Sequence, residues 1–172
     1  MTVSLVDILT IIAILASAWG ISYQVKKNRS LHAKEIAINL MHQNRFSDRW
    51  IDACNTVFSK FLSQPGYDWR GFAQRKYNPN IELSEEEQKL ADAVRDILNF
   101  CESIAIAVLS GTANEEIIWH DQKTIFLSIH GKLKPYIEYA RDEIFKDPGV
   151  CVNFNTLIEN WTTKGKVIMP LE

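Results

Sequence analysis

The stretch from Ser84 to Gly111, SEEEQKLADAVRDILNFCESIAIAVLSG, carries the clearest folding signal in the chain. Ser84 followed by Glu87 forms a capping-box pattern, in which each side chain bonds the other residue's backbone N–H, and Gly111 is a typical helix stop. Apolar residues then repeat at spacings of three and four, which places them on one helical face: Leu90, Val94, Ile97, Cys101, Ile104 and Val108. Because residues 97–109 are apolar nearly all round, we predict that this helix lies at the centre of an all-α domain.

Two polar residues interrupt this apolar segment. Asn99 and Glu102 are three apart and therefore neighbours on one helix surface. A carboxylate in an apolar turn must be paired, neutralised or placed at a polar edge. The favoured prediction pairs Glu102 with Arg45 or Arg49 of the preceding helix, since buried charges are usually paired. The alternative is a polar pocket inside the bundle, lined by these four residues, that receives a ligand or partner.

The rest of the chain also predicts helices. Residues 30–63 contain neither Pro nor Gly, so a helix can run through them without a break. Further helices are predicted over residues 115–129, 136–145 and 155–163, which gives a bundle of four to five helices. Residues 64–80, QPGYDWRGFAQRKYNPN, predict a loop because turn residues punctuate them. The aromatic and Arg side chains of this loop favour packing on the bundle over a nucleic-acid contact.

An apolar run precedes this domain. Ile8 to Val25 are eighteen consecutive residues without a formal charge, which as a helix of about 1.5 Å per residue would approach the thickness of a bilayer's hydrocarbon core. The residues expected at the membrane interface are Trp19, Tyr23, Lys26, Lys27 and Arg29. Residues 1–29 are therefore predicted to be a transmembrane anchor, and residues 30–172 a separate helical domain.

Two other interpretations of the run are less favoured. Ala16-Ser17-Ala18 resembles a signal-peptide cleavage site, but Asp7 and the absence of Lys or Arg before the run disfavour a signal peptide. A soluble core helix would show a polar stripe at every turn. Positive charge follows the run, which predicts an inner-membrane protein with its N-terminus outside and its C-terminal domain in the cytoplasm.

The net charge of −2 is unevenly distributed. Residues 26–77 hold ten Lys and Arg against four Asp and Glu, whereas residues 78–172 hold nine against sixteen. A basic half beside the anchor would suit contact with anionic lipid. The three cysteines are widely spaced and lack a CxxC pair, so reduced thiols are expected rather than disulfides or a zinc site: Cys54, Cys101 and Cys151.

The run from Ile97 to Trp119, ILNFCESIAIAVLSGTANEEIIW, resembles the DUF4760 family. The pattern that carries the resemblance is an Asn and a Glu in an apolar helix, a Gly, and an acidic helix start: Asn99, Glu102, Gly111 and Glu115-Glu116. The members of this family look like small bacterial or phage-encoded proteins that have a helical domain behind an anchor. The resemblance therefore implies membrane association and an α-helical fold, and it implies no activity.

Catalytic signatures are few. Glu116 and His120 are four apart and Asp121 follows, but a metal hydrolase would need further ligands, so a solvated helix face is favoured over a metal site. The sequence has no Walker, GxSxG or HExxH motif and no Arg–His spacing typical of helical ribonucleases. No cofactor is expected.

The leading functional hypothesis is therefore a membrane-anchored, non-enzymatic binding protein with a protein partner or a second copy of itself. If it is phage- or prophage-encoded, host interference of the exclusion type is the role we expect. The alternative is a membrane-tethered enzyme with a polar or metal site in the bundle.

Overall fold

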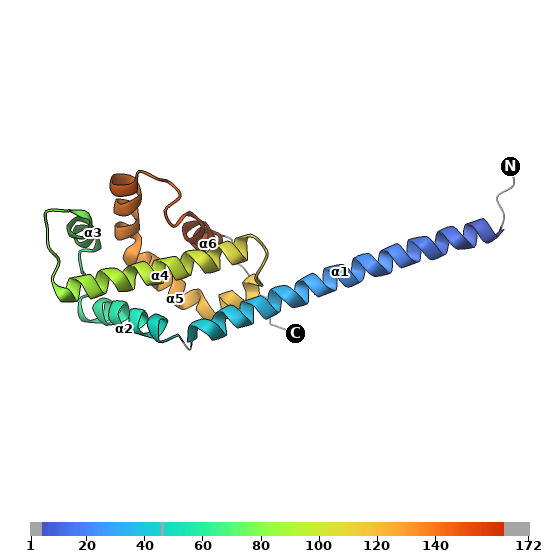
Figure 1. Cartoon of the computed structure of the whole chain (residues 1–172), viewed down its shortest axis with the longest axis horizontal. Helices are drawn as coiled ribbons and strands as arrows, with labels where there is room; N and C mark the ends of the chain where they lie inside the picture. Colours follow the sequence, from blue (N-terminus) through green and yellow to red (C-terminus); the bar gives the residue numbers. More distant parts are fainter. Residues whose placement is uncertain (1–4, 46, 164–172) are drawn as a thin grey trace.

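The computed structural model describes residues 5–45 and 47–163, with the side chains of residues 5–9, 11, 44 and 45 outside the description. Every regular element in these two ranges is helical, so the all-α prediction is confirmed. The elements are α1 (Leu5–Arg45), α2 (Asp48–Ser63), α3 (Trp69–Tyr77), α4 (Glu85–Leu109), α5 (Glu115–Tyr139), the π-helical η1 (Ala140–Phe145) and α6 (Val152–Thr163). The bundle gathers around α4 and α5, and α1 extends far beyond it (Figure 1).

Helix α4 is central, as the sequence predicts. The capping box is formed, because the Ser84 side chain accepts from the Glu87 N–H and the Glu87 carboxylate accepts from the Ser84 N–H. Gly111 ends the helix with a φ of 73°, in the left-handed region that glycine enters without strain. The predicted apolar face is buried, and α2 and α6 pack against it.

The prediction of an unbroken helix over residues 30–63 is wrong. Helix α1 ends at Arg45 and α2 begins at Asp48, with Ser47 between them in an extended conformation. The two helices bury their apolar faces against different neighbours: Ala37 and Met41 of α1 face the bundle beside α5, while α2 packs along α4. A single straight helix could not turn both apolar faces toward these neighbours, so the chain turns between α1 and α2.

Residues 64–80 hold a helix that the turn residues concealed. The Asp68 carboxylate accepts from the Gly71 N–H at 2.8 Å and caps α3, so Gly71 lies in the first turn of a helix and does not break one. Trp69 and Phe72 are buried. Packing of this segment on the bundle is therefore confirmed, although the predicted loop is replaced by α3.

The predicted break after Ile129 is also wrong, because α5 continues through Gly131 and Pro135 to Tyr139. Both residues face solvent, where water can bond the Gly131 carbonyl that the proline nitrogen leaves without a donor. The chain then winds into η1 over residues 140–145 and ends in Lys146, a non-glycine residue with a φ of 48°.

The described side chains at residues 10 and 12–25 of α1 make no contribution to the core. The large apolar side chains of α1 are exposed over residues 12–25, and Trp19 has an exposed fraction of 75%. Among the residues whose side chains the structure describes, no helix combines the length and the apolar character needed to cross a membrane. The anchor and its orientation stay predictions.

Candidate functional site

Glu102 has a structural role different from the predicted one. Its carboxylate accepts from the Asn153 N–H at 3.1 Å, from Asn153 Nδ2 at 2.8 Å and from the Phe154 N–H at 2.8 Å. These are the second and third residues of α6, whose N–H groups have no partner within the helix. Glu102 of α4 therefore caps the N-terminus of α6, as the side chain of an N-cap residue would do. This explains why α6 begins at Val152 and not at the predicted Asn155.

Arg49, one of the two arginines predicted to pair with Glu102, binds a different carboxylate. Arg49 forms two hydrogen bonds to Asp96, at 2.7 and 2.6 Å, and these bonds hold the pKa of the Asp96 carboxyl below its usual range. The prediction of a Glu102–Arg49 pair is thus wrong, because α2 runs beside α4 at the level of Asp96. The side chain of Arg45 lies outside the described residues.

Asn99 and Glu102 do not share a buried polar pocket. Asn99 is exposed and lines two surface cavities, one shared with Arg49 and one beside α5. Glu102 is half-buried and is committed to the start of α6. Three residues along a helix turn the side chain by about 60°, and here that separates one residue on the bundle surface from one facing α6.

The candidate metal ligands form no site. In residues 5–45 and 47–163, no group of three or more His, Cys, Asp or Glu side chains is arranged to hold a metal ion. Glu116, His120 and Asp121 lie on α5, and the Asp121 carboxylate accepts a hydrogen bond from Gln122 Nε2 at 2.6 Å. Among the described residues, the further ligands that a hydrolase would need are not arranged with them.

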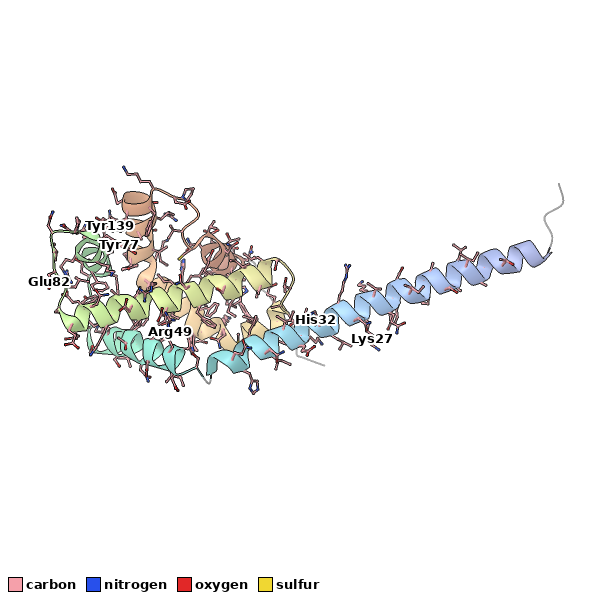
Figure 2. All side chains as sticks on the ribbon, in the orientation of Figure 1. Lys27, His32, Arg49, Tyr77, Glu82 and Tyr139 are labelled. Atoms are coloured by element: carbon pink, nitrogen blue, oxygen red, sulfur yellow. The ribbon has the colours of Figure 1, made fainter. Side chains whose placement is uncertain are left out.

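The predicted interface residues all lie on the exposed part of α1. Trp19 and Tyr23 are one turn apart, and their rings stack with centroids 6.2 Å apart. Lys26, Lys27 and Arg29 follow on the next two turns and are exposed. Figure 2 shows Lys27 on the part of α1 that lies outside the bundle. The order is apolar, then aromatic, then basic along one helix.

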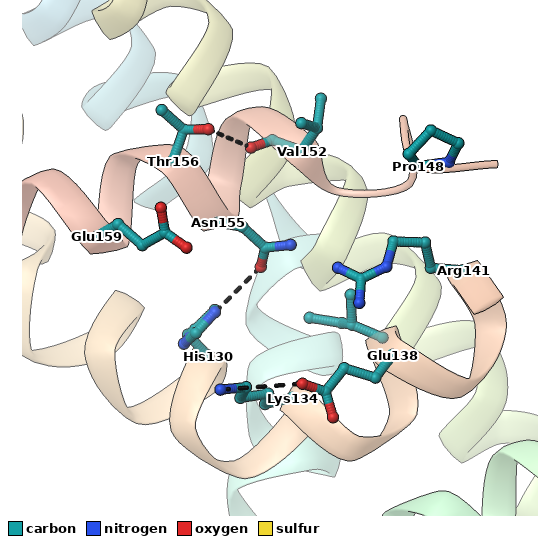
Figure 3. A pocket seen from close by; sticks show the side chains of 10 residues that line it. His130, Lys134, Glu138, Arg141, Pro148, Val152, Asn155, Thr156 and Glu159 are labelled. Carbon is teal, nitrogen blue, oxygen red and sulfur yellow. Dashed lines mark hydrogen bonds and ion pairs between the residues drawn. The ribbon is translucent and has the colours of Figure 1, made fainter.

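A polar cavity of about 360 Å³ opens between α5, η1 and α6. His130 Nε2 lies 3.0 Å from Asn155 Oδ1, and Lys134 lies 3.8 Å from Glu138. Figure 3 shows the Arg141 guanidinium reaching toward the space between Asn155 and Glu138. Burial lowers the pKa of His130 below its usual range, so its imidazole is neutral at pH 7.

A second cavity, of about 330 Å³, lies on the other side of Ile137 and η1, against α3 and α4. Its apolar walls are Ala91, Leu98, Ile137, Ala140, Phe145 and Val150. The Tyr136 hydroxyl donates to the Tyr77 hydroxyl at 3.3 Å within this wall. Burial raises the pKa of the Cys151 thiol, also in the wall, to about 12, so this cysteine is not a thiolate nucleophile at neutral pH.

The fold and both cavities belong to a chain whose residues 7–161 match the profile of the Domain of unknown function (DUF4760) family. The chain is a member of the DUF4760 family. Comparison with characterised proteins finds no match, and comparison with solved structures finds none either. The match covers the exposed part of α1 together with the bundle through Trp161. The family model therefore includes both parts of this DUF4760 protein.

The sequence did not reveal either cavity of the DUF4760 domain. The polar cavity joins residues of α5 and η1 to residues of α6, and the second cavity joins α3 and α4 to residues 136–151. No local spacing connects these segments. One signal was available: Asp147-Pro148-Gly149 marks a turn, and a turn between two helices places residues before and after it side by side. That pairing would have put His130 near α6, although not beside Asn155 in particular.

Proposed function

We propose that this protein is a membrane-tethered binding protein, in which residues 1–29 form the anchor and residues 30–172 form a cytoplasmic helical domain. The observation that carries the proposal is the exposed apolar part of α1. Ile12, Ile14, Leu15 and Ile21 have exposed fractions between 56 and 64% although they are large and apolar. Water contact of this area costs about 25 cal/mol per Å², so the segment needs an apolar environment that the bundle does not supply.

A lipid bilayer suits this segment better than a protein groove. The charge-free run is eighteen residues long, about the length that spans the hydrocarbon layer. Its apolar side chains point in all directions around the helix, whereas a groove would require one apolar face. The following Lys26, Lys27 and Arg29 would lie at anionic headgroups on the cytoplasmic side.

For the domain, binding is favoured over catalysis. The carboxylate within the apolar part of α4, Glu102, is bonded to the backbone of α6, and the thiols of Cys54 and Cys151 have raised pKa values because they are buried. A partner protein, or a second copy of this chain, would be held at the membrane by the anchor. If the chain is phage- or prophage-encoded, interference with a host membrane protein is the biological role that this architecture would serve.

The anchor is tested by charge insertion in the full chain. The double variant Ile14→Lys, Leu15→Lys puts two cations into the middle of the proposed span, where each costs about 2.5–3.5 kcal/mol. We expect it to move from the membrane pellet to the alkali-extracted fraction. The matched control Ile38→Lys, Leu62→Lys changes two exposed apolar residues outside the span and should stay in the pellet. Equal fractionation of both variants would contradict the anchor.

The interference role has its own test. Strains that express the full chain, or residues 30–172 alone, are compared for the plating efficiency of phages related to the source genome. The full chain is expected to lower plating and the shortened chain is not. Equal plating in all strains would reject the role and leave the anchor unaffected.

The polar cavity of Figure 3 favours a second candidate function, a tethered enzyme. The Asn155 Oδ1 accepts from His130 Nε2–H, so Nδ1 of the neutral, half-buried imidazole is the atom that could accept a proton from a ligand. Metal analysis of the purified protein discriminates one form of this alternative, because a stoichiometric transition metal would support catalysis and argue against a pure binding role.

A further inference from the structure

The second cavity has the form of a small-ligand site. Its volume of about 330 Å³ lies at the lower end of the range of ligand pockets, and its walls are mainly apolar. Three separate parts of the chain form these walls: α3, α4 and the segment from Tyr136 to Cys151. A site assembled from distant segments is fixed by the fold as a whole and cannot be a groove of one helix.

Unusual backbone surrounds this cavity. The π-helical η1 contributes Ala140 and Phe145, and π-helical turns are frequent at functional sites. The loop that follows is bracketed by two non-glycine residues in the left-handed region, Lys146 with a φ of 48° and Cys151 with a φ of 53°. Such conformations cost free energy and persist where the surrounding structure holds them. The backbone here is therefore held in shape by its packing.

The charges at the cavity have one sign. Lys76 and Arg95 line it, and no Asp or Glu is among its lining residues. Arg95 is engaged by Asp92 at 2.9 Å and by Asp96 at 3.6 Å, so part of its charge is neutralised. Lys76 has no ion-pair partner in the described part of the chain. The polar cavity of Figure 3 differs, because Glu138 lies there beside Lys134.

Two neutral donors stand next to these cations. The Tyr136 hydroxyl gives its hydrogen to Tyr77, which leaves the Tyr77 hydroxyl hydrogen free to donate to a ligand. The exposed Asn99 side chain lines the same cavity and supplies an amide N–H₂. Ammonium, phenol and amide donors beside an apolar chamber suit a carboxylate head on an apolar body.

We propose that this cavity binds a small amphipathic carboxylate. The alkyl chain or ring lies against Leu98, Ile137 and Ala140, and the carboxylate lies at the mouth, where Lys76 and the Tyr77 hydroxyl bind it. This site is independent of the membrane tether, and it would exist in the bundle whatever partner the protein has.

The test uses three probes that share an eight-carbon chain: octanoate, octanol and octylammonium. Each is titrated into the full-length protein in zwitterionic lipid nanodiscs, and binding is followed by ligand NMR, with empty nanodiscs measured to subtract partition into lipid. Octanoate is expected to bind at least tenfold more tightly than the other two. Equal affinity for octanol would overturn the carboxylate, and preference for octylammonium would overturn the charge assignment.

Lys76→Glu reverses the charge at the mouth without touching the apolar walls. It is expected to weaken octanoate binding at least tenfold and to leave the far-UV circular dichroism unchanged. The matched control is Lys132→Glu, at an exposed lysine on α5 outside the cavity, and it should bind octanoate as the wild type does. Equal losses in both variants would show a general charge effect and overturn the site.

Ala140→Leu fills the chamber from η1 and should abolish binding of octanoate. If this variant fails to fold, the probe series and the two lysine variants still decide the proposal. Unchanged octanoate affinity in a folded Ala140→Leu protein would overturn it.

Discussion

Glu102 is the side chain whose replacement tests the fold most directly. Its two carboxylate oxygens accept three hydrogen bonds from the first turn of α6, and no other described side chain bonds the N–H groups of Asn153 and Phe154. Glu102→Ala removes the acceptors and leaves both N–H groups without a protein partner. Glu102→Gln keeps the shape and one carbonyl oxygen but removes the charge.

The expected losses follow from these bonds. Removing a helix N-cap side chain costs about 0.5–2 kcal/mol, and a hydrogen bond to a charged group contributes about 1.5–3 kcal/mol. Because Glu102 is half-buried, water can replace part of what is lost. We therefore expect Glu102→Ala to lower the free energy of unfolding by about 2–3 kcal/mol and Glu102→Gln by about 1 kcal/mol.

The measurement is urea unfolding of the full-length protein, followed by tryptophan fluorescence. Trp161 reports on α6 because it is buried there, stacked on Phe126 and in edge contact with Trp119. Glu82→Gln is the matched control, since Glu82 is exposed in the loop before α4 (Figure 2), and surface changes stay within about 0.5 kcal/mol. A loss below about 0.5 kcal/mol in Glu102→Ala would refute the capping role.

Two further predictions concern backbone and pH. Gly111→Ala should destabilise the protein by about 1 kcal/mol because φ is 73° there, whereas Gly131→Ala should stabilise it by about 0.5–1 kcal/mol because the α5 surface is open; thermal unfolding of both variants checks the opposite signs. His130 favours its neutral form in the folded state, so its contribution is complete above about pH 6.5 and falls as the pH drops through the lowered pKa. Wild type should therefore lose stability relative to His130→Gln between pH 7.5 and 5, and parallel curves would contradict this.

The sequence predicted those parts of the fold that have a local signal. The start, face and end of α4 follow from Ser84, Glu87 and Gly111 together with one apolar repeat, and all of them occur as expected. The predicted elements are wrong where one residue type can either end a helix or lie within it. Gly71 and Pro135 are typical helix breakers, yet Gly71 donates the capping bond of α3 and Pro135 lies on an exposed face where the missing bond is tolerated.

The partner of Glu102 could not be predicted from the sequence because it lies far away along the chain. A carboxylate in an apolar helix predicts that some partner exists, and Glu102 has one. The partner is the backbone of a helix 51 residues away, and a backbone N–H has no sequence signature. The arginines appeared better candidates only because their charge is visible in the sequence. Arg49 instead forms an ion pair with Asp96, and this pair joins α2 to α4.

The rigidity of α1 links the proposed anchor to the bundle. One continuous helix carries both the exposed apolar segment and the residues that dock on the domain, where Ala37 is fully buried and the Asn114 N–H bonds the Ala33 carbonyl at 3.0 Å. A helix has no flexible joint between these two parts, so the direction in which the anchor leaves the domain is set by the α1–α5 contact. The bundle would thus be held at the membrane in one orientation, with α1 as its rigid support, as in Figure 1. A partner or ligand would then meet the same face of the domain in every copy, which is what a tethered binding protein needs.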